Sequence, residues 1–170
     1  MEAETAAKTT ADPAAARAAI LRDPAALSGV SGWRLVDQAS IDAFANVTDD
    51  RQFIHVDPAR ASAEGPYGGP VAHGFLTLSL LPALLRGALP PIPGLRSSVN
   101  YGFDRVRFVA PVPAGARIRA RFELRDAAFR GAGTLRLEWH VTVEIEGADR
   151  PALVADWIGL RHLDMAGETA

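Results

Sequence analysis

The segment HGFLTLSLLPALLRGAL, residues 73–89, decides the fold of this chain. Its apolar residues fall on nearly every side of a helix, which predicts one long helix that is buried all round. Pro82 has no backbone N–H to donate, so we expect it to kink or interrupt this helix near its middle. A helix of this kind has to be covered by other parts of the chain.

Two long segments in the second half of the chain predict that cover. Apolar and polar residues alternate along ARIRARFELRD, residues 116–126, and along TLRLEWHVTVEIEG, residues 134–147. A period of two is typical of antiparallel strands with one face packed and the other in water. The intervening RGAG, residues 130–133, predicts the turn between them. The packed face is expected to consist of Ile118, Ala120, Phe122, Leu124, Leu135, Leu137, Trp139, Val141, Val143 and Ile145.

Further strands are expected over residues 32–37, 97–111 and 150–163. The predicted fold class is therefore α+β, with an antiparallel sheet of about four or five strands wrapped around a long central helix, which is the hot-dog fold. We expect one such domain over residues 26–165, after a partly disordered N-terminal tail over residues 1–25. A single sheet leaves open edges, so we expect a homodimer whose sheet continues from one subunit into the other.

The composition excludes several classes of function. A net charge of −2 gives no basis for binding nucleic acid or an anionic membrane surface. The chain has no cysteine, which excludes disulfides and thiolate nucleophiles, and its histidines lack a spaced carboxylate set, so no metal site is expected. The N-terminal residues do not resemble a secretory signal, and no apolar segment reaches the ~18 residues of a membrane span. We therefore expect a cytoplasmic protein without a membrane contact.

The segment VTDDRQFIHVDPARASAEGPYGGPVAHG, residues 47–74, holds the residues best suited to chemistry. It collects carboxylates, histidines, prolines and glycines directly before the predicted central helix. We expect a helix over residues 38–48 with Ser40 as its N-cap, and a short helix over residues 57–64 that Asp57 caps. The segment is either a polar loop that covers a helix end or an active site.

Asp50 and His55 are candidates for a general acid/base pair. A carboxylate and an imidazole that meet at one water molecule can move a proton near neutral pH. If the residues between them were helical, the chain would turn by about 500° and leave the side chains roughly 140° apart, so the pair requires a segment that is not helical throughout. The alternative is a helix-terminating aspartate and a histidine that is hydrogen-bonded within a loop.

His73 and Gly74 stand at the start of the predicted central helix. The first N–H groups of a helix have no partner within it, so they can bind a carbonyl oxygen that becomes negative during a reaction. A glycine lets a ligand come close to the backbone there. The alternative is that His73 caps the helix and Gly74 permits tight packing. A third histidine, His140, falls on the polar face of its strand, and we expect it to face solvent.

Taken together, these segments resemble a known family. DRQFIHVDPARA, followed by GGPVAHGFLTLSL, closely resembles the MaoC-like dehydratases, the (R)-specific enoyl-CoA hydratases. The later segment NYGFDRVRFVAPVPAGARIRARFEL is similar to the nodulation-protein-N-like branch of that family, and the likeness covers about residues 26–163. The run Asp-x-x-x-x-His-x-Asp-Pro, with a downstream His-Gly on an apolar helix, is far more specific than any of its parts.

The resemblance implies a hot-dog fold with an inserted overhang, at about residues 40–70, that carries the catalytic residues to the end of the central helix. It matches Asp50 and His55 to the catalytic pair, and Gly74 to the glycine whose N–H binds the thioester oxygen. The implied enzyme is a hydro-lyase of fatty acid metabolism. It would add water reversibly and with syn geometry to a trans-2-enoyl thioester, giving the (R)-3-hydroxyacyl thioester. No cofactor is expected, and coenzyme A or phosphopantetheine enters only as part of the substrate.

Five further residues are candidates for binding this substrate. His73 stands beside Gly74, and Ser79 and Pro82 lie where relatives shape the acyl pocket, although Ser79 can instead bond back to its own helix. Arg105 and Arg107 can meet a phosphate of the carrier, either coenzyme A or acyl carrier protein, or can be rim charges.

Two other functions are open at this point. A hot-dog acyl-CoA thioesterase usually carries a carboxylate on its central helix, and residues 74–85 contain none. A non-catalytic subunit that binds acyl thioesters or stabilises a partner would have no need of both Asp50 and His55. The sequence therefore favours the hydratase.

Overall fold

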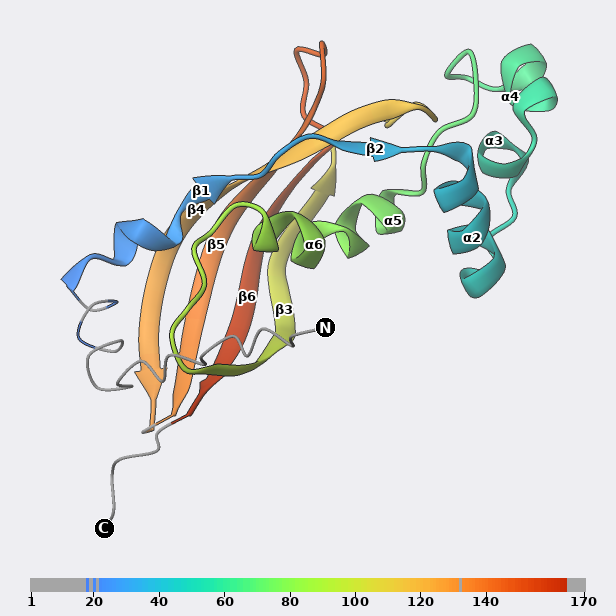
Figure 1. Cartoon of the computed structure of the whole chain (residues 1–170). Coiled ribbons are helices and arrows are strands. Elements are labelled where there is room, and N and C mark those ends of the chain that lie inside the picture. Colours follow the sequence, from blue (N-terminus) through green and yellow to red (C-terminus); the bar gives the residue numbers. More distant parts are fainter. Residues whose placement is uncertain (1–17, 19, 21, 132, 165–170) are drawn as a thin grey trace, which may run out of the picture.

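The computed structural model describes residues 18, 20, 22–131 and 133–164. Its strands form a six-stranded antiparallel sheet in the order β1–β4–β5–β6–β3, and β2 also pairs with β4 (Figure 1). The strands are β1 (Gly29–Val30), β2 (Arg34–Val36), β3 (Leu95–Phe108), β4 (Ala116–Arg130), β5 (Thr134–Ile145) and β6 (Leu153–Leu163). The helical elements are η1 (Pro24–Leu27), α2 (Gln38–Thr48), α3 (Phe53–Val56), α4 (Pro58–Glu64), α5 (Gly74–Ser79) and α6 (Leu81–Arg86).

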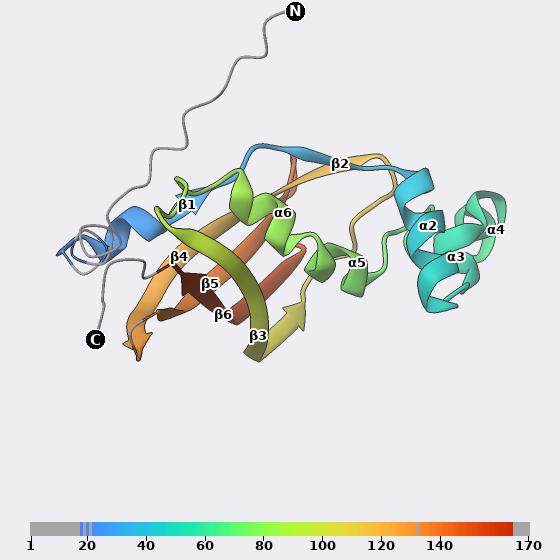
Figure 2. The same cartoon turned by 60° about the horizontal axis from the view of Figure 1, so that its bottom comes forward.

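Helices α5 and α6 lie over one face of the curled sheet, whereas α2, α3 and α4 form a cluster beyond one end of it (Figures 1 and 2). The predicted hot-dog fold is confirmed, and the cluster of α2, α3 and α4 lies where the overhang is expected. The sheet has one strand more than predicted, because the short β1 pairs with β4 beside the expected β2. Most of the expected N-terminal tail, residues 1–17, 19 and 21, lies outside the described residues.

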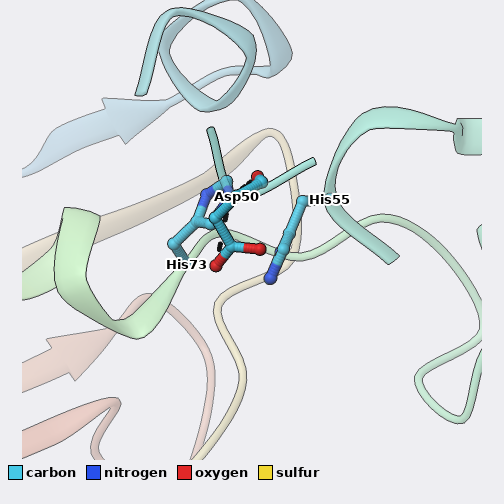
Figure 3. A group of neighbouring side chains, drawn as sticks. All are labelled: Asp50, His55 and His73. Carbon is cyan, nitrogen blue, oxygen red and sulfur yellow. Dashed lines mark hydrogen bonds and ion pairs between the residues drawn. The ribbon is translucent and has the colours of Figure 1, made fainter. Parts of the chain in front are cut away.

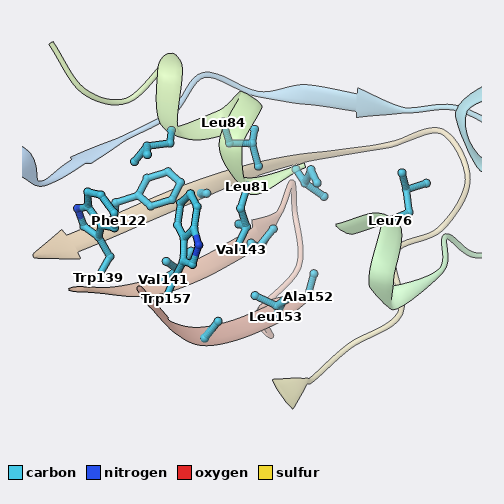
Figure 4. Packing of buried hydrophobic residues seen from close by; sticks show 14 of the residues in the cluster. Leu76, Leu81, Leu84, Phe122, Trp139, Val141, Val143, Ala152, Leu153 and Trp157 are labelled. Carbon is cyan, nitrogen blue, oxygen red and sulfur yellow. The ribbon is translucent and has the colours of Figure 1, made fainter. Parts of the chain in front are cut away.

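The core lies between the sheet and the α5–α6 segment, and it follows the predicted alternation. Buried and half-buried residues alternate along the whole of β5, and the inward residues of this strand are at most 7% exposed. Figure 4 shows Leu81 and Leu84 of α6 with Phe122, Trp139 and Trp157 of the sheet. Because each side chain of this size contributes about 1.5–3 kcal/mol when it is fully buried, this face dominates the stability of the fold.

The expectation of one long helix that is buried all round is wrong. The segment forms two short helices that meet at Leu80, and Pro82 lies in the first turn of α6, where a missing N–H costs no hydrogen bond. The interruption predicted from Pro82 is therefore confirmed. The sheet covers only one side of the two helices, so the Phe75 side chain is exposed on the other. Within the described residues, no helix is long and apolar enough to cross a membrane.

The N-caps of the overhang helices set its geometry. Asp37, rather than the predicted Ser40, caps α2, and its carboxylate accepts a hydrogen bond from the Ser40 N–H at 2.9 Å. The prediction failed because Ser40 lies inside the first turn, where its own N–H is one of the groups that need a partner. Helix α4 starts as predicted, since Asp57 accepts from the Arg60 N–H at 3.0 Å.

Candidate active site

The position of Asp50 follows from the way in which α2 ends. The helix stops at Thr48, and Asp49 adopts a left-handed conformation with φ 57°, which turns the chain out of the helix. Residues 50–52 are not helical, and α3 begins at Phe53. The non-helical segment that an Asp50–His55 pair requires is therefore present.

His55 lies on the single turn of α3, and it is buried. Its Nδ1 lies 2.6 Å from the carbonyl oxygen of Val71. A carbonyl oxygen only accepts, so Nδ1 carries the proton and Nε2 keeps its lone pair. Gln38 also donates to the backbone carbonyl of His55 at 2.7 Å, which ties α3 to α2. The fold therefore presents His55 as a base whose tautomer is fixed by the backbone.

His73 lies behind this pair at the start of α5. Its Nε2 is 2.9 Å from the backbone carbonyl oxygen of Asp50 and donates to it. Its ring stacks on the His55 ring, with centroids 3.8 Å apart, and packs against Phe44. The residue is 2% exposed, and its side chain makes no capping hydrogen bond with α5. His73 therefore holds the backbone of Asp50 and one face of His55 in place.

The carboxylate of Asp50 completes the cluster, which is drawn in Figure 3. A carboxylate oxygen of Asp50, a ring nitrogen of His55 and a ring nitrogen of His73 all lie within 4.8 Å of one another. Oδ2 of Asp50 is 4.0 Å from Nε2 of His73, and the Asp50 side chain is 56% exposed. The structure thus brings the predicted pair together, with a buried base beside a carboxylate that water can reach.

A pocket of about 270 Å³ connects His55 with the start of α5. Gly74 and Thr77 line it from α5, and Phe108 lines it from the end of β3. A Cβ atom on Gly74 would lie 2.8 Å from the Phe108 ring, so this ring packs directly against bare backbone. Gly74 is the first residue of α5, and its N–H therefore has no partner within the helix.

The electrostatic surroundings of His55 favour its neutral form. Burial lowers the pKa of His55 below its ordinary value, and the neighbouring His73 ring acts in the same direction. The hydrogen bond with Val71 and the charge of Asp50 raise the pKa of His55, but burial prevails. Since the free Nε2 is then unprotonated at neutral pH, it can take a proton from a bound water molecule.

This arrangement of residues agrees with what the comparisons show. Residues 11–143 match the family model described as the MaoC like domain. The chain belongs to the MaoC-like family. Its relatives include nodulation protein N of Rhizobium leguminosarum bv. viciae, which is 53% identical over 136 residues that cover 80% of this chain and 84% of the relative. The resemblance to MaoC-like dehydratases that the motifs indicate is confirmed.

Two further members carry names that describe an activity. The 3-hydroxyacyl-thioester dehydratase Z of Mycobacterium tuberculosis is 45% identical over 130 residues, covering 76% of this chain and 85% of the relative. A solved structure of the (R)-hydratase from A. caviae, involved in PHA biosynthesis, superimposes with a TM-score of 0.60 at 25% identity, covering 78% of this chain and 94% of the other. Dehydratases and hydratases among its relatives place the MaoC-like chain with the hydro-lyases.

The remaining predicted site residues of this MaoC-like chain lie elsewhere. Ser79 is exposed, and its hydroxyl donates to the Phe75 carbonyl at 2.7 Å, which is the backbone alternative. Pro82 lines two other pockets, further along α5 and α6. Arg105 and Arg107 are exposed on β3 and do not line the pocket beside Gly74.

Among the residues of the pocket that the sequence did not predict, three are of interest. Thr77 is buried and lines it one turn after Gly74, a spacing that could have identified it once Gly74 was chosen. Phe108 and Tyr67 line the pocket from β3 and from the loop after α4. No local pattern marks these two aromatic residues, because only the tertiary structure brings their segments to α5.

The cluster of Asp50, His55 and His73 also has to be considered as a metal site, because three donor atoms lie close together. Nε2 of His73 and Nδ1 of His55 are, however, engaged as donors to backbone carbonyls. The nitrogens that remain are Nε2 of His55 and Nδ1 of His73, which is buried without a partner among the described residues, and zinc sites in proteins normally use at least three protein ligands. The absence of a metal site therefore stays our prediction.

His140 corrects a second expectation. It lies on the outer face of β5 as predicted, but it does not simply face solvent. Its Nδ1 is 2.7 Å from Oδ1 of Asp156 on the neighbouring β6, and the His140 side chain is 32% exposed. Alternation along one strand predicts the face of a residue but not the residue that pairs with it from the next strand.

Proposed function

We propose that this MaoC-like chain is an (R)-specific 2-enoyl-thioester hydratase, which in the reverse direction dehydrates the (R)-3-hydroxyacyl thioester. The observation that carries this proposal is the tautomer of His55: Nδ1 donates to Val71, so Nε2 keeps its lone pair, and a ring nitrogen of His55 lies within 4.8 Å of an Asp50 carboxylate oxygen. The pocket that joins His55 to the first N–H of α5 supports it further. The names of the dehydratase and (R)-hydratase relatives are consistent with the same chemistry.

In the proposed reaction, a water molecule lies between Nε2 of His55 and the carboxylate of Asp50. The water oxygen forms a bond with C3 of the enoyl group while His55 takes one of its protons. The electron pair of the double bond moves toward the thioester, and the carbonyl oxygen becomes negative. The N–H of Gly74 donates to this oxygen at the start of α5. One member of the pair then returns a proton to C2 on the same face, so that the elements of water are added without change in oxidation state.

His73 acts in this scheme as a positioning residue. It donates to the Asp50 backbone and stacks on His55, so it fixes the distance between the carboxylate and the base. Preorganisation of this kind is important because a small misplacement of reacting groups costs much of the rate. The substrate itself is expected to meet Asp50, His55 and Gly74.

The carrier of the acyl group is proposed to be coenzyme A or acyl carrier protein. Arg105 and Arg107 are exposed on β3, and they are our candidates for contact with a carrier phosphate. We also propose a homodimer that forms along β3. Within the described residues this strand pairs only with β6, and its exposed apolar side chains are Leu95, Val99, Tyr101 and Phe108. Sedimentation equilibrium tests the dimer, and a monomer at all accessible concentrations would contradict it.

The first experiment follows the loss of enoyl absorbance with crotonyl-CoA and with trans-2-decenoyl-CoA. We expect loss of absorbance with at least one of them and an (R)-3-hydroxyacyl product, identified by chiral chromatography. An (S) product would overturn the stereochemical part of the proposal. Unchanged absorbance with both substrates, from a folded protein, would overturn the hydratase itself, and release of free thiol would indicate a thioesterase.

A further inference from the structure

A larger pocket lies at the opposite end of the α5–α6 segment. Its volume is about 500 Å³, and it extends from α6 and the loop after it to the inner face of the sheet. Most of its wall is apolar, and two tryptophans line it, Trp139 and Trp157, whose side chains are drawn in Figure 4. The lining also contains Arg161 of β6, a residue that the hydration chemistry does not use.

Arg161 is buried without a counter-ion. It is 4% exposed, and no carboxylate within the described residues makes an ion pair with it. Its Nη1 donates to the adjacent Leu160 carbonyl at 3.1 Å, and its guanidinium carbon lies 5.1 Å from the centre of the Trp139 ring. These contacts leave the other N–H groups of the guanidinium without a hydrogen bond among the described residues. Burial also lowers the pKa of Arg161 from its ordinary value.

Two residues on the same strand as Arg161, Gly159 and Trp157, bear on the space and the polar groups around it. Gly159 leaves room for the guanidinium, because a Cβ atom there would lie 2.8 Å from Nη1 of Arg161 and 3.1 Å from the Trp139 ring. The buried indole N–H of Trp157, a residue that lines the same pocket, has no hydrogen-bond partner in the described part of the chain. The indole N–H of Trp157 is closed to solvent, but Arg161 lines the pocket, where an acceptor on a ligand would satisfy its remaining N–H groups. A carboxylate matches a guanidinium best, through two parallel charge-assisted hydrogen bonds.

The position of this pocket relates it to the proposed reaction. Gly74 and Thr77 line the pocket beside His55, Leu78 to Pro82 line a smaller pocket of about 250 Å³, and Pro82 to Leu89 line the large one. The two latter pockets share Pro82, Asn100 and Trp157. The three pockets therefore lie in succession along α5 and α6. At a helical rise of 1.5 Å per residue, this segment is on the order of 20 Å long. The pocket beside His55 shares no lining residue with the other two, so a long acyl chain whose thioester lies at Gly74 must pass along α5 to reach Arg161.

We propose that the large pocket binds the distal end of the acyl chain, and that Arg161 recognises a carboxylate there. The preferred substrates would then be long-chain enoyl or 3-hydroxyacyl thioesters that carry a carboxyl group at the far end of the chain. This inference rests on the proposed hydratase function for its place in the reaction. The apolar walls accept the methylene groups, and the guanidinium replaces the water that the carboxylate gives up.

The kinetic test compares two long-chain enoyl-CoA substrates of equal length, one ending in a carboxylate and one in a methyl group. We expect the wild type to favour the carboxylate by about tenfold to a hundredfold in kcat/KM, the range for a hydrogen bond to a charged group. Arg161→Met should abolish this ratio, and Arg161→Lys, which keeps the charge but not the fork of donors, should retain part of it. Arg117→Met, at an exposed position of β4 away from the pocket, is the matched control and should keep the full ratio.

The result that overturns the inference is a wild type that treats both chain ends alike, or a preference that persists in Arg161→Met. Preference for a neutral hydroxyl end over the carboxylate would also overturn it. A second measurement does not depend on turnover or on the variants. A long-chain dicarboxylic acid should quench the fluorescence of Trp139 and Trp157 in the wild type at lower concentration than its dimethyl ester. If no enoyl-CoA is hydrated but this difference is seen, the hydratase function fails and the carboxylate site stands; equal quenching by the acid and the ester removes the site.

Discussion

The two ends of the α5–α6 segment hold their polar side chains differently, although each also has a buried nitrogen without a hydrogen-bond partner among the described residues: Nδ1 of His73 at one end and Nε1 of Trp157 at the other. At the start of α5, the imidazoles of His55 and His73 each donate to a backbone carbonyl, so both are held in one tautomer and one orientation. At the end of α6, the buried guanidinium of Arg161 donates to the Leu160 carbonyl and makes no ion pair among the described residues. The difference indicates that backbone carbonyls fix the orientation of the two imidazoles, whereas the guanidinium in the far pocket has N–H groups left for a ligand.

The largest effect is expected from Asp50→Asn and His55→Gln, which break the preorganised end. Each should lower kcat for hydration by about 10²–10⁴-fold, because general acid/base help is removed while the fold is kept. Asp49→Asn is the matched control, since asparagine also tolerates the left-handed conformation at φ 57° and should leave the rate unchanged. Activity is measured as the loss of enoyl absorbance. A rate in Asp50→Asn equal to the wild type would remove Asp50 from the mechanism.

A smaller loss is expected from Gly74→Ala. The added Cβ would lie 2.8 Å from the Phe108 ring, so the ring must move and the pocket beside His55 changes shape. Overpacking of this kind costs ~1–3 kcal/mol, which we expect as a lower midpoint of unfolding and about a tenfold loss of kcat/KM. In the control Gly87→Ala the nearest atom is the Leu84 carbonyl oxygen at 3.6 Å, an ordinary contact. If Gly74→Ala and Gly87→Ala behave alike, close packing at Gly74 has no role.

Changes at His73 should have a moderate effect and should also shift the pH profile. His73→Gln keeps a donor for the Asp50 carbonyl, whereas His73→Ala loses a hydrogen bond worth about 1 kcal/mol and should be roughly fivefold slower.

His55 must be neutral to act as a base, so hydration should fall as the pH drops through its pKa, which burial holds below the ordinary value of about 6.5. The His73 ring helps to lower this pKa, so its removal should move the acid limb to higher pH.

The pH profile of kcat/KM, measured for the wild type and for both His73 variants, checks this direction. His140→Gln changes a histidine on the outer face of the sheet and should leave the acid limb where it is. A shift of the limb to lower pH in His73→Gln would contradict the assigned effect of His73 on His55.

The smallest expected effect is that of a chelator. Since two ring nitrogens of the cluster are engaged by backbone carbonyls, we expect dialysis against EDTA to leave the rate of hydration unchanged. Metal content measured by mass spectrometry before and after dialysis is the accompanying control. Loss of activity that only an added divalent cation restores would show that Asp50 and His55 serve as metal ligands.

The outcome of the sequence predictions differs between the sheet and the helices. The inward residues of β5 were predicted correctly because the period of two is a property of the strand itself. The α5–α6 segment was predicted as one buried helix, and this was wrong because its composition does not reveal that the sheet covers only one side. The cap of α2 was misplaced by a few residues, since Asp37 and Ser40 both suit a helix start.

The amino-acid sequence by itself determined the strands, the break at Pro82 and the motif that carries Asp50, His55 and Gly74, because each depends on residues close together in the chain. Only the tertiary structure decided the tautomer of His55, since Val71, whose carbonyl fixes it, lies 16 residues further along. It also decided that Phe108 closes on Gly74 and that Arg161 has no counter-ion. Such properties depend on which groups meet after folding, and a local pattern does not encode a partner that arrives from another strand or loop.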